Sequence, residues 1–376
     1  PKLPHSEEEL RHLAHFFRVL VDSPGQMTPK LILRGPLGTG KTTLARRFGL
    51  DFEAYASKRK VKLRFAYFNC REEGSFYALL KKALNLFQVE IPERGFSSEE
   101  LLNLLVEALG RKGFQLLLAL DEVESLIWRE GSKPLYVLTR LGEKTVSTSP
   151  GKISLILIFR EPECEEALAR LDSSTLSTLG HNVLQLAKYS ASQLKEILEY
   201  RVEEAFKPDT VLPEAIELAA DLAGERGDAR LAIELLWLAG KQADLERAGK
   251  VLPEHVRAAR LKVDLTVQRE HLQGLSFHEK LLLLAAARKL SASEEAYISF
   301  GEVEREYQAA CEEYGEKPRR HTQLWKYLKG LALKGLLQTR ASGKGLRGRT
   351  TLIGLPLPSS LLREELEAHL ERERAS

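Results

Sequence analysis

The segment GPLGTGKT (residues 35–42) has the pattern G-x-x-x-x-G-K-[ST] of a phosphate-binding loop. Its glycines let backbone N–H groups wrap phosphate oxygens, Lys41 would reach the β- and γ-phosphates, and Thr42 would offer its hydroxyl to Mg²⁺. A chance glycine-rich turn is the alternative, but an apolar run (30–34) precedes the loop and a helical segment (41–57) follows it. The sequence therefore predicts an ATP- or ADP-binding site made by Gly35, Pro36, Gly38, Thr39, Gly40, Lys41, Thr42 and Thr43.

Two carboxylates end the segment QLLLALDE (115–122). The continuous apolar run before them predicts a strand that is buried on both faces. Asp121 would then lie at the carboxyl edge of the sheet and bind Mg²⁺ together with Thr42, and Glu122 would polarise the attacking water. Such a pair could also cap a helix, but its combination with the phosphate-binding loop favours a catalytic role for Lys41, Asp121 and Glu122.

Positive charge is concentrated near the C-terminus, although the formal net charge of the chain is only +3. Residues 317–350 contain ten Lys or Arg and no Asp or Glu. A helix expected over 319–335 carries polar side chains in its first turn, as a recognition helix does, and a basic glycine-rich loop follows at 341–348. This pattern predicts DNA contacts by Arg319, Arg320, His321, Thr322, Gln323, Lys326, Lys344, Arg347 and Arg349.

Other interpretations of this basic segment stay open. It could be a solvated basic face, or a winged helix that contacts another protein. If it does read bases, Gln323 could recognise adenine and Arg319 or Arg320 could recognise guanine.

The elements that must position these residues follow an α/β pattern in the first half of the chain. Apolar runs at 30–34, 61–69, 115–120 and 153–159 alternate with helical segments, which predicts a parallel sheet covered by helices on both faces. Helices are expected at 75–87, 98–109 and 132–146 in this half.

After about residue 187 the predicted strands stop. Four helices are expected at 190–206, 213–223, 228–248 and 253–266, with Pro and Gly near their ends. Three further helices (276–290, 300–314 and 319–335) and two short strands around the basic loop predict a winged helix. We therefore expect a parallel-sheet nucleotide-binding domain (1–187), a small helical domain (188–268) and a C-terminal winged-helix domain (269–376).

The overall composition is consistent with this plan. A length of 376 residues predicts two or three domains. The three cysteines (Cys70, Cys164 and Cys311) are far apart and suggest neither zinc binding nor disulfides. No signal peptide or membrane-spanning run is recognisable. We expect a cytoplasmic, nucleoid-associated protein without a membrane partner.

With these motifs in place, the sequence resembles the archaeal origin-recognition initiators of the AAA+ class, which are relatives of the eukaryotic origin-recognition and loading-factor ATPases. The resemblance covers nearly the whole chain. GDARLAIELL (227–236) is among the matching pieces, and the most specific are the C-terminal ones, YGEKPRRHTQLWKYL (314–328) and GLRGRTTLI (345–353), which a bare AAA+ enzyme would lack. It implies an AAA+ domain, a helical lid and a winged helix that binds double-stranded origin DNA.

The resemblance also implies roles for residues outside the two motifs. Leu3, Pro4 and His5 would line the adenine pocket, with Tyr189 and Ile197 as neighbours. Arg230, by itself an ordinary helix charge, would be the sensor-2 arginine that couples the lid to the phosphates. The segment 75–105 would be an insertion that touches DNA, and Phe87 and Arg94 are its candidate contacts.

The sequence departs from the family pattern at two positions. Glu161 stands near the place of a polar sensor-1 residue, which is often Asn. Ser174 stands where the family often has an arginine finger. Arg160 or Arg170 could substitute, but both departures predict a slow ATPase that acts as a nucleotide switch.

The predicted function is that of a DNA replication initiator. Its expected partners are origin duplex DNA, the replicative helicase and paralogous initiators, and its cofactors are ATP or ADP with Mg²⁺. A nucleotide-sensing transcription regulator with the same parts and a clamp-loader-like AAA+ ATPase are the alternatives. The C-terminal winged helix argues against the second of these.

Overall fold

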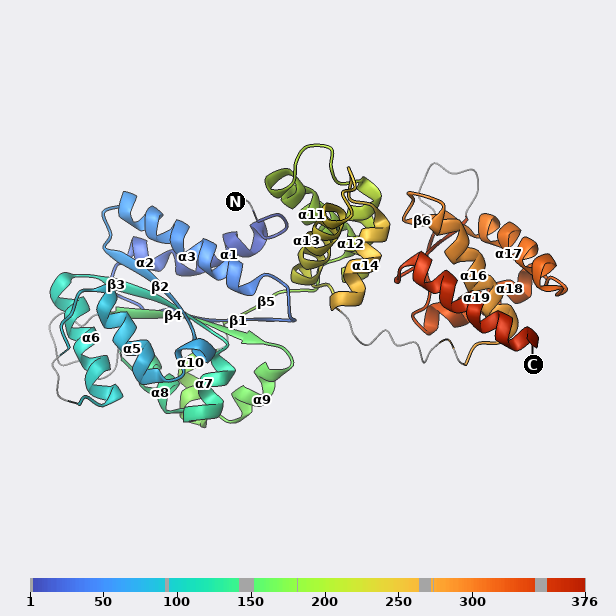
Figure 1. Ribbon diagram of the computed structural model, residues 1–376. Coiled ribbons are helices and arrows are strands. Elements are labelled where there is room, and N and C mark those ends of the chain that lie inside the picture. The colour runs from blue at the N-terminus through green and yellow to red at the C-terminus, as the bar shows by residue number, and fades with distance from the viewer. Residues whose placement is uncertain are drawn as a thin grey trace. The chain divides into compact units, whose positions relative to one another are not determined.

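The computed structural model divides the chain into two compact units, Pro1–Tyr189 and Ser190–Ser376. Figure 1 shows both units along the chain, from blue at the N-terminus to red at the C-terminus. The structure describes residues 3–91, 95–141, 152–180, 182–263, 272, 274–341 and 350–375.

The first unit is built on a five-stranded parallel sheet with the strand order β2-β3-β4-β1-β5. The strands are β1 (Lys30–Gly35), β2 (Leu63–Asn69), β3 (Gln115–Asp121), β4 (Lys152–Arg160) and β5 (Val183–Gln185). Every residue of β3 is buried, as its continuous apolar sequence predicts. The parallel-sheet prediction is confirmed, whereas the short strand β5 was not predicted.

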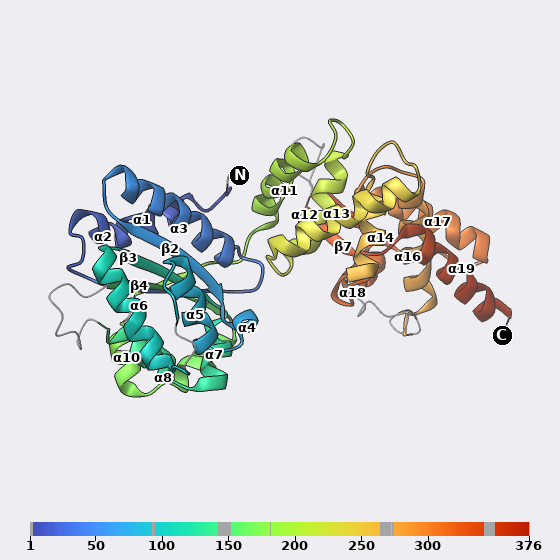
Figure 2. The same ribbon diagram turned by 60° about the vertical axis from the view of Figure 1, so that its left-hand side comes forward.

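Helices cover both faces of this sheet, as Figures 1 and 2 show. One face carries α1 (Glu7–Phe17), α2 (Val19–Asp22) and α3 (Lys41–Lys58). The other face carries α4 (Cys70–Glu73), α5 (Phe76–Leu86), α6 (Ser98–Lys112), α7 (Val123–Glu130), α8 (Lys133–Thr139), α9 (Glu163–Ala169) and α10 (Ser173–Leu179).

Alternate residues of the central strands divide between the two cores of the first unit. Leu116 and Leu118 of β3 pack with α5 and α6, whereas Leu117 packs with α1 and α3. Because side chains alternate along a strand, a strand covered on both faces needs apolar residues at every position. The sheet is thus held between two helical layers, and its carboxyl edge carries the predicted motifs.

The second unit begins with four helices, as predicted. They are α11 (Ala191–Ala205), α12 (Pro213–Gly224), α13 (Ala229–Leu245) and α14 (Pro253–Val263). Ser190 caps α11 through a reciprocal capping box with Gln193, and Asp228 caps α13 by accepting from the amides of Arg230 and Leu231. These polar residues explain why the helices begin where they do.

The C-terminal part of the second unit is a winged helix with one addition. It contains α16 (Phe277–Ser291), α17 (Phe300–Tyr314), α18 (His321–Leu333) and α19 (Ser359–Ala375). Its antiparallel sheet has the order β6-β8-β7 and is made by β6 (Tyr297–Ser299), β7 (Gln338–Ala341) and β8 (Thr351–Gly354). Neither β6 nor α19 was predicted.

The C-terminal helix α19 completes the core of the winged helix. Leu362, Leu366 and Leu370 are at most 2% exposed and join the same hydrophobic cluster as α16. Arg288 of α16 donates hydrogen bonds to Glu313 of α17 and to Glu367 of α19. Within the described part of the chain, none of the helices has the length and apolar character needed to cross a bilayer.

Candidate functional site

The predicted phosphate-binding loop lies between β1 and the first turn of α3. Gly40 adopts the left-handed backbone conformation (φ +81°) immediately before α3, and a Cβ at this position would lie 3.2 Å from the hydroxyl of Tyr189. Lys41 Nζ donates to the carbonyls of Gly35 and Pro36, at 2.6 Å each. The ammonium is therefore folded over the loop, at the place where a nucleotide's phosphates would meet the helix N-terminus.

Lys41 is largely buried at this position. Burial lowers the pKa of its ammonium, and the nearby carboxylates of Asp121, Glu124 and Glu161 oppose this shift. Thr39 is also buried and donates from its hydroxyl to the carbonyl of Pro36, which fixes the turn of the loop. Thr43 is exposed on the outer side of α3.

Asp121 and Thr42 are brought together by the ends of β3 and α3. The hydroxyl of Thr42 donates to Asp121 Oδ2 at 2.5 Å. A hydroxyl and a carboxylate are oxygen ligands of the kind that Mg²⁺ prefers, and Mg²⁺ usually takes its remaining ligands from water and phosphate. These two residues therefore fit a nucleotide-bound Mg²⁺ ion.

Tyr67 belongs to this site although it was not predicted. Its hydroxyl donates to Asp121 Oδ2 at 2.8 Å, and the guanidinium of Arg46 lies over its ring. Burial, followed by the charge of Asp121, raises the pKa of Tyr67. The position follows from the register of the sheet, because Asn69 at the end of β2 pairs with Asp121 at the end of β3.

Replacing Tyr67 with phenylalanine should weaken Mg²⁺-dependent nucleotide binding by roughly fivefold, because Asp121 loses a donor worth about 1 kcal/mol. Titration of ATP at several Mg²⁺ concentrations measures this effect. Tyr77→Phe on α5 is the matched control and should leave the affinity unchanged. An equal loss in both variants would contradict a role for the Tyr67 hydroxyl.

Glu122 follows β3 in the left-handed conformation, with φ 51° and ψ 48°. Its Oε2 is buried and has no hydrogen-bond partner among the described residues, and Arg71 Nη1 lies 4.0 Å away. A left-handed backbone at a non-glycine residue and a buried carboxylate oxygen without a hydrogen-bond partner are features that often mark functional sites. This geometry suits a carboxylate that orients a water molecule.

Glu124 is a further carboxylate that the sequence prediction did not single out. It is 0% exposed, and in the described part of the chain neither of its carboxylate oxygens has a hydrogen-bond partner. Burial raises its pKa to about 7. Arg160 Nε lies 3.9 Å from Glu124 and 3.4 Å from Glu163. The third acid in the segment LDEVE (120–124) could have indicated this group, since it follows the same buried strand.

The structure shows the surroundings of Glu161 and Ser174, which depart from the family pattern, and of the arginines that could substitute there. Arg160 ends β4 in register with Gly35 of the phosphate-binding loop, so this arginine lies closer to the candidate site than the sequence could show. Glu161 accepts a hydrogen bond from Gln185. Ser174 accepts one from Arg140 at 2.6 Å, and the exposed Arg170 pairs with Glu166.

The N-terminal segment lies beside the phosphate-binding loop. Leu3, Pro4 and His5 are half-buried, and His5 has a left-handed backbone with φ 61°. Ser6, the next residue, is buried and hydrogen-bonds the hydroxyl of Tyr189, whose pKa is raised by burial. The structure thus connects this segment to Gly40 through Tyr189, and its role as an adenine pocket stays a prediction.

Two predicted nucleotide contacts belong to the second unit. Ile197 is a buried residue of α11, and Arg230 is exposed in the first turn of α13. Their roles at the nucleotide stay predictions.

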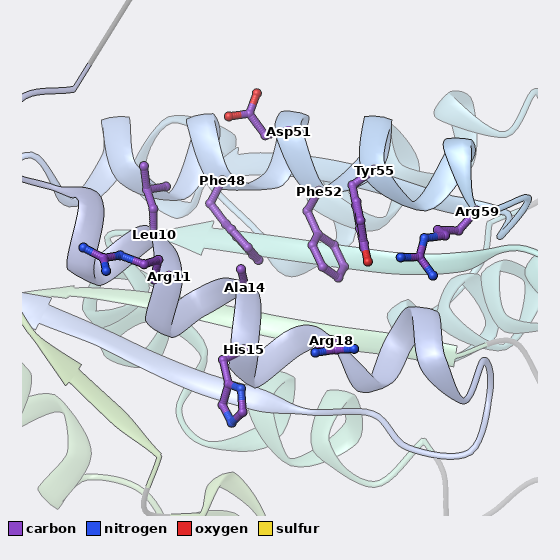
Figure 3. Close-up of a pocket in the computed structure, with 10 residues that line it drawn as sticks. All are labelled: Leu10, Arg11, Ala14, His15, Arg18, Phe48, Asp51, Phe52, Tyr55 and Arg59. Atoms are coloured by element: carbon purple, nitrogen blue, oxygen red, sulfur yellow. The ribbon is translucent and has the colours of Figure 1, made fainter.

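A recess of about 720 Å³ lies between α1 and α3 (Figure 3). Phe48 and Phe52 stack at 5.2 Å along α3 and, with Tyr55, face Leu10 and Ala14 of α1. The predicted nucleotide-binding residues do not line this recess. Its aromatic row instead packs α1 against α3, the helix that carries Lys41 and Thr42 in its first turn.

The predicted DNA-binding helix is α18, which begins at His321 with Arg320 as its N-cap. Arg319, Arg320, Thr322 and Lys326 are exposed, and Gln323 is half-buried. The amide of Arg319 donates to the hydroxyl of Tyr307, a buried residue of α17 that also bonds His278. This anchor fixes the start of the helix.

His321 is exposed but has partners within the protein. It pairs with Glu304 at 3.0 Å and packs against the ring of Phe300. These residues line a recess of about 550 Å³ together with Thr322, Trp325, Thr350 and Thr351, next to the base of the predicted wing.

Phe87 has to be withdrawn as a DNA contact. Its ring is only 6% exposed and packs edge-on against Phe114 in the core, because the α5–α6 pair buries its apolar face there. Arg94 and the wing residues Lys344, Arg347 and Arg349 lie outside the described residues.

Comparison with known proteins identifies the domains of the chain. Three family models match: an AAA domain at residues 27–168, a Cdc6 AAA+ ATPase-type lid domain at 195–261, and a CDC6 C-terminal winged helix domain at 270–365. The ORC1-type DNA replication protein 2 of Saccharolobus solfataricus is 34% identical over 363 residues, which are 95% of this chain and 87% of that protein. The chain belongs to the ORC1/Cdc6 family of DNA replication proteins.

Solved ORC1/Cdc6 structures show the same fold. The crystal structure of Cdc6p from Pyrobaculum aerophilum has a TM-score of 0.87 and 31% identity, covering 99% of this chain and 95% of the other. The Aeropyrum pernix ORC1 protein, solved in complex with DNA, has a TM-score of 0.61 and 30% identity, covering 98% and 93%. The predicted AAA, lid and winged-helix architecture is therefore confirmed.

Proposed function

We propose that this ORC1/Cdc6 protein is a replication initiator that binds duplex DNA at an origin and uses ATP and ADP as a slow switch. The observation that carries the proposal is the presence, in one chain, of the Lys41–Thr42–Asp121 site and of an exposed basic helix, α18. The related ORC1 of Aeropyrum pernix was solved with DNA, and ORC2 of the same organism with ADPNP and ADP.

The residues of the phosphate-binding loop would hold the nucleotide. Lys41 would exchange the carbonyls of Gly35 and Pro36 for phosphate oxygens, and Thr42 with Asp121 would hold Mg²⁺. A bound Mg²⁺ ion would neutralise phosphate charge. The N-terminal segment Leu3–His5 and Tyr189 would form the adenine pocket.

Hydrolysis would depend on Glu122, which would orient water in line with the γ-phosphate. Arg160 would supply positive charge at the end of β4 in place of the usual sensor-1 side chain, and Arg230 would act from the lid. An arginine held by two carboxylates is a weaker phosphate ligand than an uncommitted one, which supports slow turnover.

Duplex binding would use the first turns of α18 and the predicted wing. Arg319, Arg320 and Lys326 would meet phosphates or base edges, and Thr322 and Gln323 would contact bases in the major groove. Lys344, Arg347 and Arg349 would reach the backbone or an adjacent groove. Nucleotide state would then govern recruitment of the replicative helicase and contacts with paralogous initiators.

Footprinting on genomic origin DNA tests the proposal, with ATP, with ADP and without nucleotide. We expect protection of defined sites and a difference between the ATP and ADP patterns. Uniform protection of any DNA at low salt, independent of nucleotide, would contradict the initiator function.

Replacing Arg320 with alanine should weaken duplex binding and reduce the slope of log affinity against log salt by roughly 0.9, the value for one lost phosphate contact. Fluorescence anisotropy over a range of salt concentrations measures both quantities. Arg111→Ala, an exposed arginine of α6 paired with Glu107, serves as the control and should change neither. An unchanged slope in the Arg320 variant would show that this residue does not contact phosphate.

A further inference from the structure

The sheet of the winged helix is tied to the lid through Arg340. This residue lies on β7, the strand that leads into the predicted wing, and pairs with Leu352 on β8. Its Nη1 lies 2.6 Å from Glu217 Oε1 and 3.2 Å from Asp221 Oδ2, and both carboxylates belong to lid helix α12. Arg340 thus faces the lid, although the sequence grouped it with the basic residues of the DNA-binding segment.

Tyr297 closes this cluster from β6, the strand on the other side of β8. The guanidinium of Arg340 lies 4.2 Å from the centre of the Tyr297 ring. The hydroxyl of Tyr297 donates a hydrogen bond to Asp221 at 2.6 Å. One cation therefore engages two carboxylates and an aromatic face at once. Stacking and ion pairing at one site favour arginine over lysine.

A second attachment is made by Arg257 of lid helix α14, which is only 1% exposed. It donates to the carbonyls of Ala296 and Leu355, at 2.9 and 3.1 Å, and to Glu254. Ala296 precedes β6 and Leu355 follows the central strand β8, so this arginine holds the ends of two adjacent strands of the sheet. A buried charge is tolerated when its donors are satisfied in this way.

Glu254 extends this attachment to the C-terminal helix. Its Oε1 accepts a hydrogen bond from the amide of Ser359, at the start of α19, at 2.7 Å. The lid therefore contacts the winged helix through backbone groups and side chains at several separate points. An arrangement of this kind resists both sliding and rotation of one domain on the other.

We propose that Arg340 is a positioning residue that locks the winged-helix sheet onto the lid, so that these two domains move as one body and Arg340 does not contact DNA. The proposal rests on the proposed function in one respect. If the position of the lid changes with the bound nucleotide, helix α18, which would bind DNA, moves together with the lid. The lock itself is independent of nucleotide and DNA.

The lock is tested by a distance measurement in the full-length protein. Spin labels on Leu245→Cys at the end of α13 and Gln308→Cys on α17 report the separation of lid and winged helix. Both positions are exposed, whereas the three native cysteines are buried and resist labelling. We expect a narrow distance distribution in the otherwise unchanged protein and a broadened one in Arg340→Ala. Arg305→Ala, an exposed arginine of α17, is the control and should keep the narrow distribution.

Salt-dependent DNA binding separates the lock from a phosphate contact. Arg340→Ala should keep the salt slope of the parent protein, whereas Lys326→Ala should reduce it by roughly 0.9. Coupling between nucleotide and DNA is measured by the ratio of the duplex dissociation constants with ADP and with ATP. This ratio is typically about fivefold or more for a coupled pair of sites, and we expect it to fall towards one in Arg340→Ala. The double variant Arg340→Glu with Glu217→Arg exchanges the two charges of this ion pair. It should recover part of the difference between ADP and ATP in duplex affinity.

Two results would overturn the proposal. One is a salt slope that falls by roughly 0.9 in Arg340→Ala, because this residue would then contact phosphate. The other is a distance distribution that is broad in the parent protein or stays narrow in Arg340→Ala. If Arg340→Ala does not fold, Glu217→Gln removes its nearest partner and carries the same expectations. A parent protein that ignores DNA would refute the proposed function, and the label distances would still decide the lock.

Discussion

Replacing Lys41 with alanine is expected to abolish measurable binding of both ATP and ADP. The ammonium is buried over the phosphate-binding loop and donates to two loop carbonyls at 2.6 Å, so it is already placed to meet two phosphate oxygens. Loss of two charge-assisted hydrogen bonds, each worth about 1.5–3 kcal/mol, corresponds to at least about a 100-fold fall in affinity. Calorimetry with ATP and ADP measures the loss.

Lys58→Ala, in the last turn of the same helix, is the matched control for this experiment. It removes an equal charge from α3 at a distance from the loop and should leave nucleotide affinity unchanged. A Lys41→Ala protein that keeps its melting temperature and binds ATP with the parent affinity would refute the assignment of the loop.

The second large effect is expected from Glu122→Gln, which should keep nucleotide binding and lose hydrolysis. The amide has nearly the same shape but cannot accept a proton from water or polarise it in the same way. A positioned general base typically contributes about 10²–10⁴-fold to a rate, so turnover should fall by at least about 100-fold. Single-turnover phosphate release, with binding measured in parallel, separates the two effects.

Glu165→Gln provides the comparison, because this carboxylate is highly exposed on α9. The Glu165→Gln protein should hydrolyse ATP at the same rate as the parent protein. If Glu122→Gln also keeps that rate, the residue that activates water lies elsewhere, and Glu124, buried at the same strand end, becomes the next candidate to test.

The fold and the placement of the loop 35–42 beside Asp121 were predictable because their signals are local. The loop 35–42, the acidic pair 121–122 and the apolar strand that precedes each of them are each contained within a few residues. The alternation of β3 between two hydrophobic clusters is likewise a direct consequence of a strand without polar residues between Leu116 and Leu120. The C-terminal helix could have been predicted, since Leu362, Leu366 and Leu370 recur at the spacing of one helical face.

The parts that were missed depend on contacts between segments distant in the sequence. Tyr67 reaches Asp121 only because β2 and β3 are in register, which no local pattern shows. Phe87 was assigned by analogy to a DNA contact, but packing of α5 on α6 buries it. Arg340 looked like one more cation in a basic segment, because its acidic partners belong to a helix more than a hundred positions earlier.

The shared surface of lid and winged helix has a consequence for hybrid proteins made from relatives. Asp221 and Tyr297, like Glu217 and Arg340, contribute complementary halves to that surface. If the winged-helix domain of a relative with other residues at positions 297 and 340 is joined at residue 270, Glu217 and Asp221 lose their counterparts. A graft of the winged-helix domain should therefore be joined near Ser190, so that both halves of this surface come from the same protein.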